Sequence, residues 1–470
     1  MEFNNSIVWF RRELRFVDNA ALDKACLCSK TIVPVFIFDT KILSTLVDKQ
    51  DKRVYFIFES LKEMEEELKT YGKSLVVRIG DPTVEIPKLA QEFKADCVFT
   101  SNDYENYSIQ RDYKVKTKLK DLNIQFISVK DQVIFEGTEV VKQNNLPYVV
   151  YTPYKNEWLK KAHENDFNCY SFDFKKFINK ENIHTVPFSW KLTEVGFSPA
   201  TLWLATGRKG ALEKIKQFIS KINDYSENRD YFSNNDTSNL SVHLRFGTIS
   251  IREAFRFAFQ YKSKGAEIWI NELIWREFYK MILSEFPHVE SMPFKKDLKD
   301  IPWENNEEFF EKWTKGQTGF PIVDAAMRHL NETGWMHNRL RMIVASFLTK
   351  DLLIDYRKGE QYFAEKLLDY DLSSNNGGWQ WSASTGCDAQ PYFRVFNPES
   401  QSLKFDPEGK FIRKLCPELS HLDNKNIHTP YKVTWNLFSH HKNSGDLSYP
   451  KPIVEHDQQR LKAIAMFKKS

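Results

Sequence analysis

Short apolar runs alternate with amphipathic stretches over the first 130 residues of the chain. The runs SIVWF and IVPVFIF are typical of buried strands, and residues 54–70 place apolar side chains at helical spacing. The five strand-like runs are residues 6–10, 32–38, 75–79, 97–100 and 125–129. Buried strands separated by helices predict βαβ units and a parallel sheet. No GxGxxG follows any of these strands, so the sheet alone does not identify a ligand.

The pattern changes after residue 130. Residues 131–200 are polar, with scattered prolines and aromatic side chains and weak periodicity, as in a long connection between domains. Helical periodicity then dominates in residues 202–223, 251–261, 266–286, 320–331, 336–353 and 360–368. The expected fold class is therefore α/β + α: a Rossmann-like α/β domain over 1–130, an interdomain connection over 131–200, and an all-α domain over 201–470.

Composition narrows the functional classes. Apolar residues make up 41% and charged residues 28%, which is ordinary for a globular protein, and no apolar run approaches the ~18 residues of a membrane span. The formal net charge is only +4, so nucleic-acid binding would need a local basic face. The six cysteines form no CxxC pair, so we expect reduced thiols and no metal site. The 12 Trp and 37 Phe exceed the needs of a core and suit planar ligands.

The stretch WINELIWREFYK combines rings and charges on a predicted helix. Helical spacing puts Trp269, Glu272, Arg276 and Tyr279 on one face, with Trp275 beside Glu272. One interpretation is a packing helix with a surface ion pair between the glutamate and the arginine. The other is a pocket wall, in which an indole stacks on a base, a carboxylate bonds the edge of that base, and an arginine meets phosphate.

A second predicted helix begins near Trp335. Asn338, Arg341 and Met342 share one of its faces, while Arg339 points toward another. Two arginines and a histidine at a helix start are consistent either with a solvated face or with an edge that contacts phosphates.

The segment DYDLSSNNGGWQW predicts a ligand-binding loop, because its paired Asn and Gly residues let a backbone approach a ligand closely. Asp369, Asp371 and Asn375 supply polar groups, and Trp379 and Trp381 supply rings. The spacing and terminal Glu of an EF-hand calcium loop are missing. We therefore expect a site for a flat, polar heterocycle.

These motifs resemble the photolyase/cryptochrome family, most closely its class I cyclobutane pyrimidine dimer photolyases. The resemblance runs from VWFRRELRFVDNAAL to YPKPIVEH, and is densest in NELIWREFY, TGFPIVDAAMRHLNETGWMHNRLRM, FLTKDLLIDYRKGEQYF and DLSSNNGGWQWSASTGCDAQPYFRVFNP. It implies a helical FAD-binding domain and light-dependent repair of UV-damaged DNA. Photoexcited reduced FAD (FADH⁻) would pass an electron to a flipped-out dimer. The alternative that the resemblance allows is a cryptochrome-like blue-light photoreceptor with a signalling role.

Site residues carry over from the family position by position. The implied FAD contacts are Tyr225, Thr237, Ser238, Asn239, Leu240, Ser241, Trp269, Arg341, Asp369, Tyr370, Asp371 and Asn375, with Asn375 at flavin N5. The implied dimer and DNA contacts are Arg229, Glu272, Trp275, Arg276, Tyr279, Asn338, Arg339, Met342, Trp381 and Gln401. Glu272 would hydrogen-bond the dimer in its protonated form.

Three positions favour dimer repair within the family. Glu272 would be a glutamine in six-four photolyases, which also carry paired histidines where only His337 stands here. Met342 would be a glutamine in DASH-type cryptochromes.

The chain departs from the family in its electron relay. Trp379 and Trp303 match two of three expected tryptophans, but the middle position is Tyr356. Tyrosine is harder to oxidise unless it loses its proton, so we expect impaired photoreduction of oxidised flavin, or a relay through Trp313 instead.

The chain also departs from the family at the positions that would bind a second, antenna chromophore. Folate-binding relatives would carry Asn-Glu where Tyr107-Ser108 stand, and lysine in place of Glu290, which weakens methenyltetrahydrofolate as a second chromophore. A deazaflavin, a second flavin or an empty cleft remain alternatives. Asn239, arginine in some relatives, would weaken a phosphate contact. We expect a cytoplasmic monomer that has no membrane partner.

Overall fold

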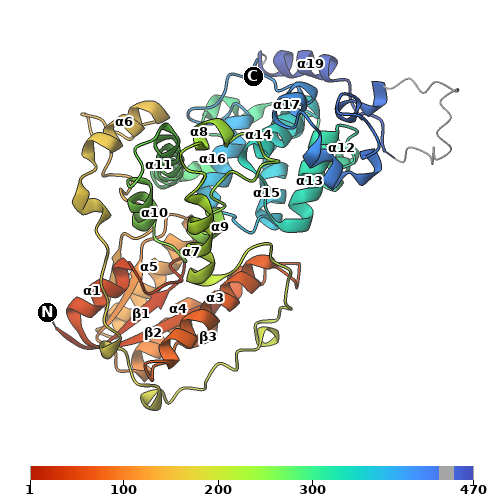
Figure 1. Ribbon diagram of the computed structural model, residues 1–470. Coiled ribbons are helices and arrows are strands. Elements are labelled where there is room, and N and C mark those ends of the chain that lie inside the picture. Colours follow the sequence, from red (N-terminus) through yellow and green to blue (C-terminus); the bar gives the residue numbers. More distant parts are fainter. Residues whose placement is uncertain (1, 433–448, 469–470) are drawn as a thin grey trace. The chain divides into compact units, whose positions relative to one another are not determined.

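The computed structural model describes residues 2–432 and 449–468 (Figure 1). Its contacts divide the chain into two compact units. Unit 1 comprises Met1–Asn223 and Ser238–Pro287, and unit 2 comprises Asp224–Thr237 and His288–Ser470. This division groups the first helices of the predicted all-α region with the sheet. The boundaries inferred at residues 130 and 200 stay a prediction.

Unit 1 is built on a five-stranded sheet whose strands are all parallel, in the order β3-β2-β1-β4-β5. The strands are β1 (Phe3–Phe10), β2 (Ser29–Asp39), β3 (Val76–Gly80), β4 (Cys97–Ser101) and β5 (Gln125–Val129). The parallel sheet expected from the buried apolar runs is confirmed. β1 is the central strand, because it pairs with β2 on one side and β4 on the other. Most of its side chains are buried, as expected for a parallel strand that has helices on both faces of its sheet.

Helices cover the sheet (Figure 1). They are α1 (Ala20–Cys28), the short α2 (Thr40–Leu43), α3 (Lys52–Lys69), α4 (Pro82–Glu92) and α5 (Asn106–Asp121). Ile7 and Trp9 of β1 form one core cluster with Leu89 of α4 and Leu119 of α5, so these two helices share a face of the sheet. Alternation along the strand therefore sorts the side chains of β1 between the two layers.

Part of the predicted connection is a helix packed on the rest of unit 1. Helix α6 (Tyr151–Lys161) lies against α11 (Lys264–Glu285). The buried side chains of α6 are Tyr151, Tyr154 and Trp158, a spacing of three and four residues. This helical spacing could have predicted α6 from the sequence, but the prolines around it favoured the interpretation as a connection between domains.

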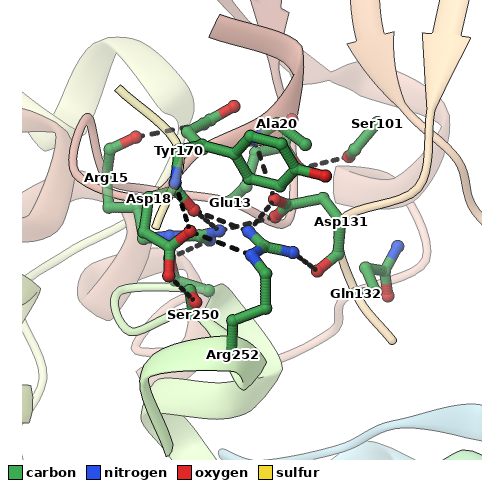
Figure 2. Close-up of polar contacts among 12 residues, drawn as sticks. Glu13, Arg15, Asp18, Ala20, Ser101, Asp131, Gln132, Tyr170, Ser250 and Arg252 are labelled. Atoms are coloured by element: carbon green, nitrogen blue, oxygen red, sulfur yellow. Dashed lines mark hydrogen bonds and ion pairs between the residues drawn. The ribbon is translucent and has the colours of Figure 1, made fainter. Parts of the chain in front are cut away.

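The other helices of unit 1 are α7 (Gly207–Phe218), α9 (Ser241–Phe246) and α10 (Ile251–Ala258). A buried ion cluster joins α10 to the loops that follow β1 and β5 (Figure 2). Asp131 accepts from Nη2 of Arg15 and from Nη2 of Arg252, each at 2.7 Å, and Arg252 Nε also bonds Asp18 Oδ1 at 2.9 Å. Ser250 Oγ donates to Asp18 Oδ2 at 2.6 Å. Ion pairs between residues far apart in the sequence thus attach α10 to the loops that follow two strands of the sheet.

Described residues of unit 2 form helices and loops only. The helices are α8 (Tyr225–Asn228), α12 (Glu307–Lys315), α13 (Pro321–Thr333), α14 (Asn338–Ser346), α15 (Tyr356–Lys366), α16 (Leu372–Ser382), α17 (Pro398–Phe405), α18 (Lys410–Leu415) and α19 (His456–Lys468). None of the helices described in either unit is long and apolar enough to cross a membrane.

The loop predicted for DYDLSSNNGGWQW is wrong, because Leu372–Ser382 is the helix α16. Asp371 caps its N-terminus by accepting a hydrogen bond from the Ser374 backbone N–H at 3.2 Å. Trp379 then packs so closely on α15 that a side chain at Gly359 would collide with its indole. Capping and tertiary packing outweigh the low helix propensity of paired Asn and Gly.

Candidate functional site

An ion pair between α14 and the segment before α16 forms the first part of the candidate site in unit 2. Arg341 Nη2 lies 3.0 Å from Oδ1 and 2.8 Å from Oδ2 of Asp369. Arg341 Nε donates to the Met336 carbonyl at 2.8 Å, so both ends of the guanidinium are fixed. The pair presents a planar, oriented group of the kind that suits the edge of a heterocycle.

Asn375, on α16, has an oriented amide. Its Nδ2 donates to the Glu360 backbone carbonyl at 3.0 Å, while Asn376 Nδ2 bonds Glu360 Oε1 at 3.0 Å. Among residues 2–432 and 449–468, none donates to Oδ1 of Asn375, so this oxygen could accept a hydrogen bond from a ligand. Burial raises the pKa of Glu360 to about 7. An acceptor held in this way fits the N–H of a reduced flavin at N5.

Four further predicted flavin residues, Asp371, Tyr370, Tyr225 and Thr237, lie in unit 2. Ser373 Oγ donates to Asp371 Oδ1, so the Asp371 carboxylate is hydrogen-bonded at the N-terminus of α16. Tyr370 packs against the main apolar core of the unit. Tyr225 is buried under the Arg229 guanidinium, which lies 5.5 Å from its ring centroid. Thr237 ends the first segment of unit 2.

The predicted FAD contacts from Ser238 to Ser241 lie in unit 1, where the chain turns sharply. Asn239 has a φ of 52°, a left-handed conformation that asparagine adopts more readily than most residues. The Leu240 N–H bonds Ser238 Oγ at 3.4 Å, and α9 begins at Ser241. The turn gives a physical reason for asparagine at position 239.

Helix α11 carries the predicted lesion-contacting residues of unit 1. Trp275 is half-buried and stacks on Tyr151, with ring centroids 3.6 Å apart and planes 9° from parallel. Tyr279 lies 5.5 Å from the same indole, and Arg276 Nη1 donates to the Gln132 carbonyl at 2.6 Å. Glu272 is half-buried as well. These side chains therefore lie on a stretch of α11 that is partly exposed to solvent and is not part of the buried core.

Trp269 differs from its neighbours on α11. It is buried against Phe218 and Phe257, with centroid distances of 5.4 and 5.9 Å. Its contacts are those of a core residue, and its predicted role at the flavin stays a prediction.

The predicted DNA residues of unit 2 cluster at the start of α14. Asn338 Nδ2 contacts Met342 Sδ at 3.8 Å, so the two share a helix face as the spacing predicts. Arg339 Nη2 pairs with Asp230 at 2.7 Å and lies over the ring of Phe405 at 4.5 Å. The arginine is thus held by an acidic partner that a phosphate would have to displace. Of the other three, Arg229 lies over the Tyr225 ring and Trp381 is half-buried on α16. Gln401 keeps its Oε1 buried with no hydrogen-bond partner among the described residues.

Trp379 of the predicted electron relay contacts Trp313, the residue named as an alternative relay. Within the described residues, the rings that contact Trp379 are Trp313 at 6.1 Å and Phe363 at 5.0 Å. Trp313 in turn contacts Tyr362 at 5.8 Å. Tyr356 is buried, and its burial raises the pKa of its phenol. Sequence reasoning named Trp313 only as an alternative and missed Tyr362, because ring contacts across helices leave no local pattern.

The antenna positions of unit 1 are occupied by internal contacts. Tyr107 donates its hydroxyl to Asp39 Oδ2 at 2.6 Å, and the Arg111 guanidinium lies 5.7 Å from the tyrosine ring. Ser108 is buried and offers no carboxylate. Neither side chain reproduces an Asn-Glu pair.

Two family models match the chain. The model described as DNA photolyase covers residues 6–170, and the one described as the FAD binding domain of DNA photolyase covers residues 269–469. The second match agrees with the donor and acceptor set of Arg341, Asp369 and Asn375, which fits a flavin.

Curated relatives and solved structures are similar to this chain over nearly its whole length. A deoxyribodipyrimidine photo-lyase of Escherichia coli is 38% identical over 98% of both chains, and one of Synechococcus is 37% identical over 97% of this chain and 96% of the relative. The crystal structure of a class III photolyase from Agrobacterium tumefaciens superposes with a TM-score of 0.89 at 33% identity, covering 100% of this chain and 99% of that one. A Synechocystis cryptochrome superposes with a TM-score of 0.87 at 26% identity, covering 99% of each. With both family models and these full-length relatives, the chain belongs to the DNA photolyase family.

Proposed function

We propose that this protein is a deoxyribodipyrimidine photo-lyase, which uses light to split cyclobutane pyrimidine dimers in UV-damaged DNA. The observation that carries the proposal is the oriented Asn375 amide on α16, which packs against α14 and its Arg341–Asp369 pair. FAD, when bound and reduced, supplies an electron donor that visible light excites. The full-length similarity to enzymes of this name supports the assignment.

The roles of the flavin-side residues follow from their contacts. Asn375 Oδ1 would accept from the N5–H of the reduced ring, because its Nδ2 is committed to the Glu360 carbonyl. Arg341, whose guanidinium is fixed by Asp369, would bind the edge of the isoalloxazine. The chain therefore holds a proton at N5 and orients the ring system without supplying a nucleophile.

The roles of the lesion-side residues follow from base flipping. A dimer must leave the stack, which costs roughly a few kcal/mol, and less for a lesion that already pairs poorly. The half-buried indole of Trp275 offers a surface on which the flipped pyrimidines stack. Glu272 would hydrogen-bond the polar edge of the dimer, where negative charge develops. Arg339 and Arg276 meet the flanking phosphates.

The test is repair of a defined lesion. An oligonucleotide with a single thymine dimer is incubated with the FAD-loaded, reduced protein under blue light or in the dark, and intact dimer is measured by chromatography. We expect loss of the dimer only in the light, and no loss of a six-four photoproduct in a parallel sample. Retention of the dimer by protein shown to hold reduced FAD would refute the proposal and favour the cryptochrome-like photoreceptor.

The second chromophore and the assembly state complete the proposal. We expect no folate antenna, because Tyr107 is bonded to Asp39 and Ser108 lacks a carboxylate. A deazaflavin or a second flavin is the alternative, and the photolyase structure of Sulfolobus tokodaii (34% identical, TM-score 0.84, 99% of this chain and 100% of that one) holds two FAD molecules. Extraction of bound pigments from purified protein identifies which is present. One lesion needs one flavin site, so we expect a monomer, acting in the cytoplasm.

A further inference from the structure

Tyr151 covers one face of the indole that the proposed function assigns to the lesion. We infer that Tyr151 is a positioning residue for lesion recognition: it holds Trp275 in one orientation, so that only the opposite face of the indole takes a flipped pyrimidine dimer. The inference rests on the proposed function, in which Trp275 stacks on the dimer.

The stack is close and nearly parallel. The ring centroids of Tyr151 and Trp275 are 3.6 Å apart and the planes differ by 9°. Tyr151 is buried, while Trp275 is half-buried. A ring at this distance excludes any other group from the face that it covers, so a base can stack only on the other face.

A hydrogen bond fixes Tyr151 on α11. The Tyr151 hydroxyl donates to the backbone carbonyl of Asn271 at 2.7 Å. Asn271 precedes Trp275 by one helical turn, so the phenol spans the turn from the carbonyl to the indole. The tyrosine is therefore bound at its hydroxyl and at its ring to the same helix.

Neighbouring contacts hold the rest of α6 in place. Phe278 meets both rings edge-on, at 5.6 Å from Trp275 and 5.8 Å from Tyr151. Two residues beyond Trp275 on α11, Glu277 accepts from Trp158 Nε1 at 2.7 Å, and Trp158 lies on α6. Helix α6 is thus fastened to α11 at two points, and Tyr151 does not move independently of Trp275.

Rigidity has a consequence for binding. An indole that is already held in the binding orientation loses little rotational freedom when a base stacks on it, which favours affinity. Without the Tyr151 ring, the indole can turn into the vacated space and must be reordered when DNA binds. The effect concerns lesion-containing DNA, because undamaged DNA does not present a flipped dimer.

The experiment compares binding by full-length, FAD-loaded variants in the dark. Tyr151→Leu removes the ring, Tyr151→Phe keeps the ring and loses the hydroxyl, and Trp275→Ala removes the stacking surface. Tyr148→Leu is the matched control, because Tyr148 contacts Tyr154 at 6.4 Å and belongs to the same segment. Dissociation constants are measured for one oligonucleotide with and without a thymine dimer, and flavin content and thermal midpoint verify folding. Tyr151→Met replaces the leucine variant if the latter does not fold.

We expect Tyr151→Leu to weaken lesion binding by roughly 3- to 10-fold, the range of an aromatic pair, with undamaged DNA unaffected. Tyr148→Leu should bind the lesion like the wild type. Tyr151→Phe keeps the ring but loses the bond to Asn271, so its lesion binding should fall between those of the wild type and Tyr151→Leu. In a Trp275→Ala background, Tyr151→Leu should have no further effect, because the side chain that it positions is gone.

Two results overturn the inference in distinguishable ways. If Trp275→Ala weakens lesion binding and Tyr151→Leu does not, Tyr151 does not position the indole. If Trp275→Ala binds the lesion like the wild type, the stacking role of Trp275 in the proposed function fails, and the inference fails with it.

Discussion

Replacing Asp131 by asparagine perturbs the buried ion cluster of unit 1 (Figure 2). The carboxylate is 2% exposed and accepts from Arg15 and Arg252, each at 2.7 Å, and from the Ala20 N–H at 3.1 Å. Asparagine keeps the shape but leaves two buried guanidinium groups short of one negative charge. Breaking a buried pair in this way costs about 3–5 kcal/mol, so we expect the free energy of unfolding of unit 1 to fall by that amount.

The contribution of Asp131 to stability should also depend on pH in the acid range. Burial alone would raise the pKa of Asp131, but the charges of Arg15 and Arg252 outweigh it and lower the pKa from 3.8 to about 2. A depressed folded pKa contributes stability that is present above the unfolded pKa and is lost as the pH falls through the folded one. Wild type should therefore lose about 2 kcal/mol from this group between about pH 4 and pH 2, and Asp131→Asn should lack that loss.

The assay is urea unfolding followed by circular dichroism at neutral pH and along the acid range. Glu157→Gln is the control, because Glu157 forms an exposed pair with Lys160 at 4.0 Å in the same unit and should change stability by about 0–1 kcal/mol. If Asp131→Asn unfolds at the urea concentration of this control and keeps the wild-type acid slope, the cluster does not stabilise the unit and the reasoning is refuted.

Four further predictions follow from single side chains. Burial raises the pKa of Glu277 from 4.5 to about 7, so wild-type stability should fall by about 3 kcal/mol as the pH rises through that window, and urea unfolding of Glu277→Gln should show no such fall. Tyr356→Trp should speed photoreduction of oxidised flavin under light with an external thiol, followed by absorbance, and an unchanged rate would count against Tyr356 as the slow step. Trp313→Phe should slow the same reaction if the contact of Trp313 with Trp379 carries the electron. Arg341→Lys loses the two-oxygen contact to its aspartate and should lower the ratio of bound FAD to protein, whereas full flavin content would contradict a role at the ring.

The local pattern of apolar residues was enough to predict many of the helices and strands. The run at residues 125–129 coincides with β5 (Gln125–Val129), and the stretch 251–261 contains α10 (Ile251–Ala258). Burial on a sheet or on one helix face imposes a short period on the sequence, which can be read without knowing the partner. The stretch 336–353 was predicted as one helix, but its end is a π-helical turn, Phe347–Asp351. Periodicity does not distinguish such a turn from a continuing α-helix.

The loop predicted for residues 369–381 shows where local pattern fails. Intrinsic propensity argued against a helix, yet the Asp371 cap and the close approach of Trp379 to Gly359 produce α16. The site residues within it were identified from their side chains and their family motif. Their orientation depends on a helix that propensity does not predict.

By itself, the sequence determined the parallel α/β sheet, the helical second half and the motifs that mark a photolyase, because periodicity and motif spacing are local properties. Only the tertiary structure decided how the side chains are used. The acceptor of Asn375 is defined by a carbonyl on a neighbouring helix, and the covered face of Trp275 by a tyrosine on α6. That tyrosine bonds Asn271, 120 residues away along the chain. Contacts over such separations arise from packing, and no stretch of sequence contains them.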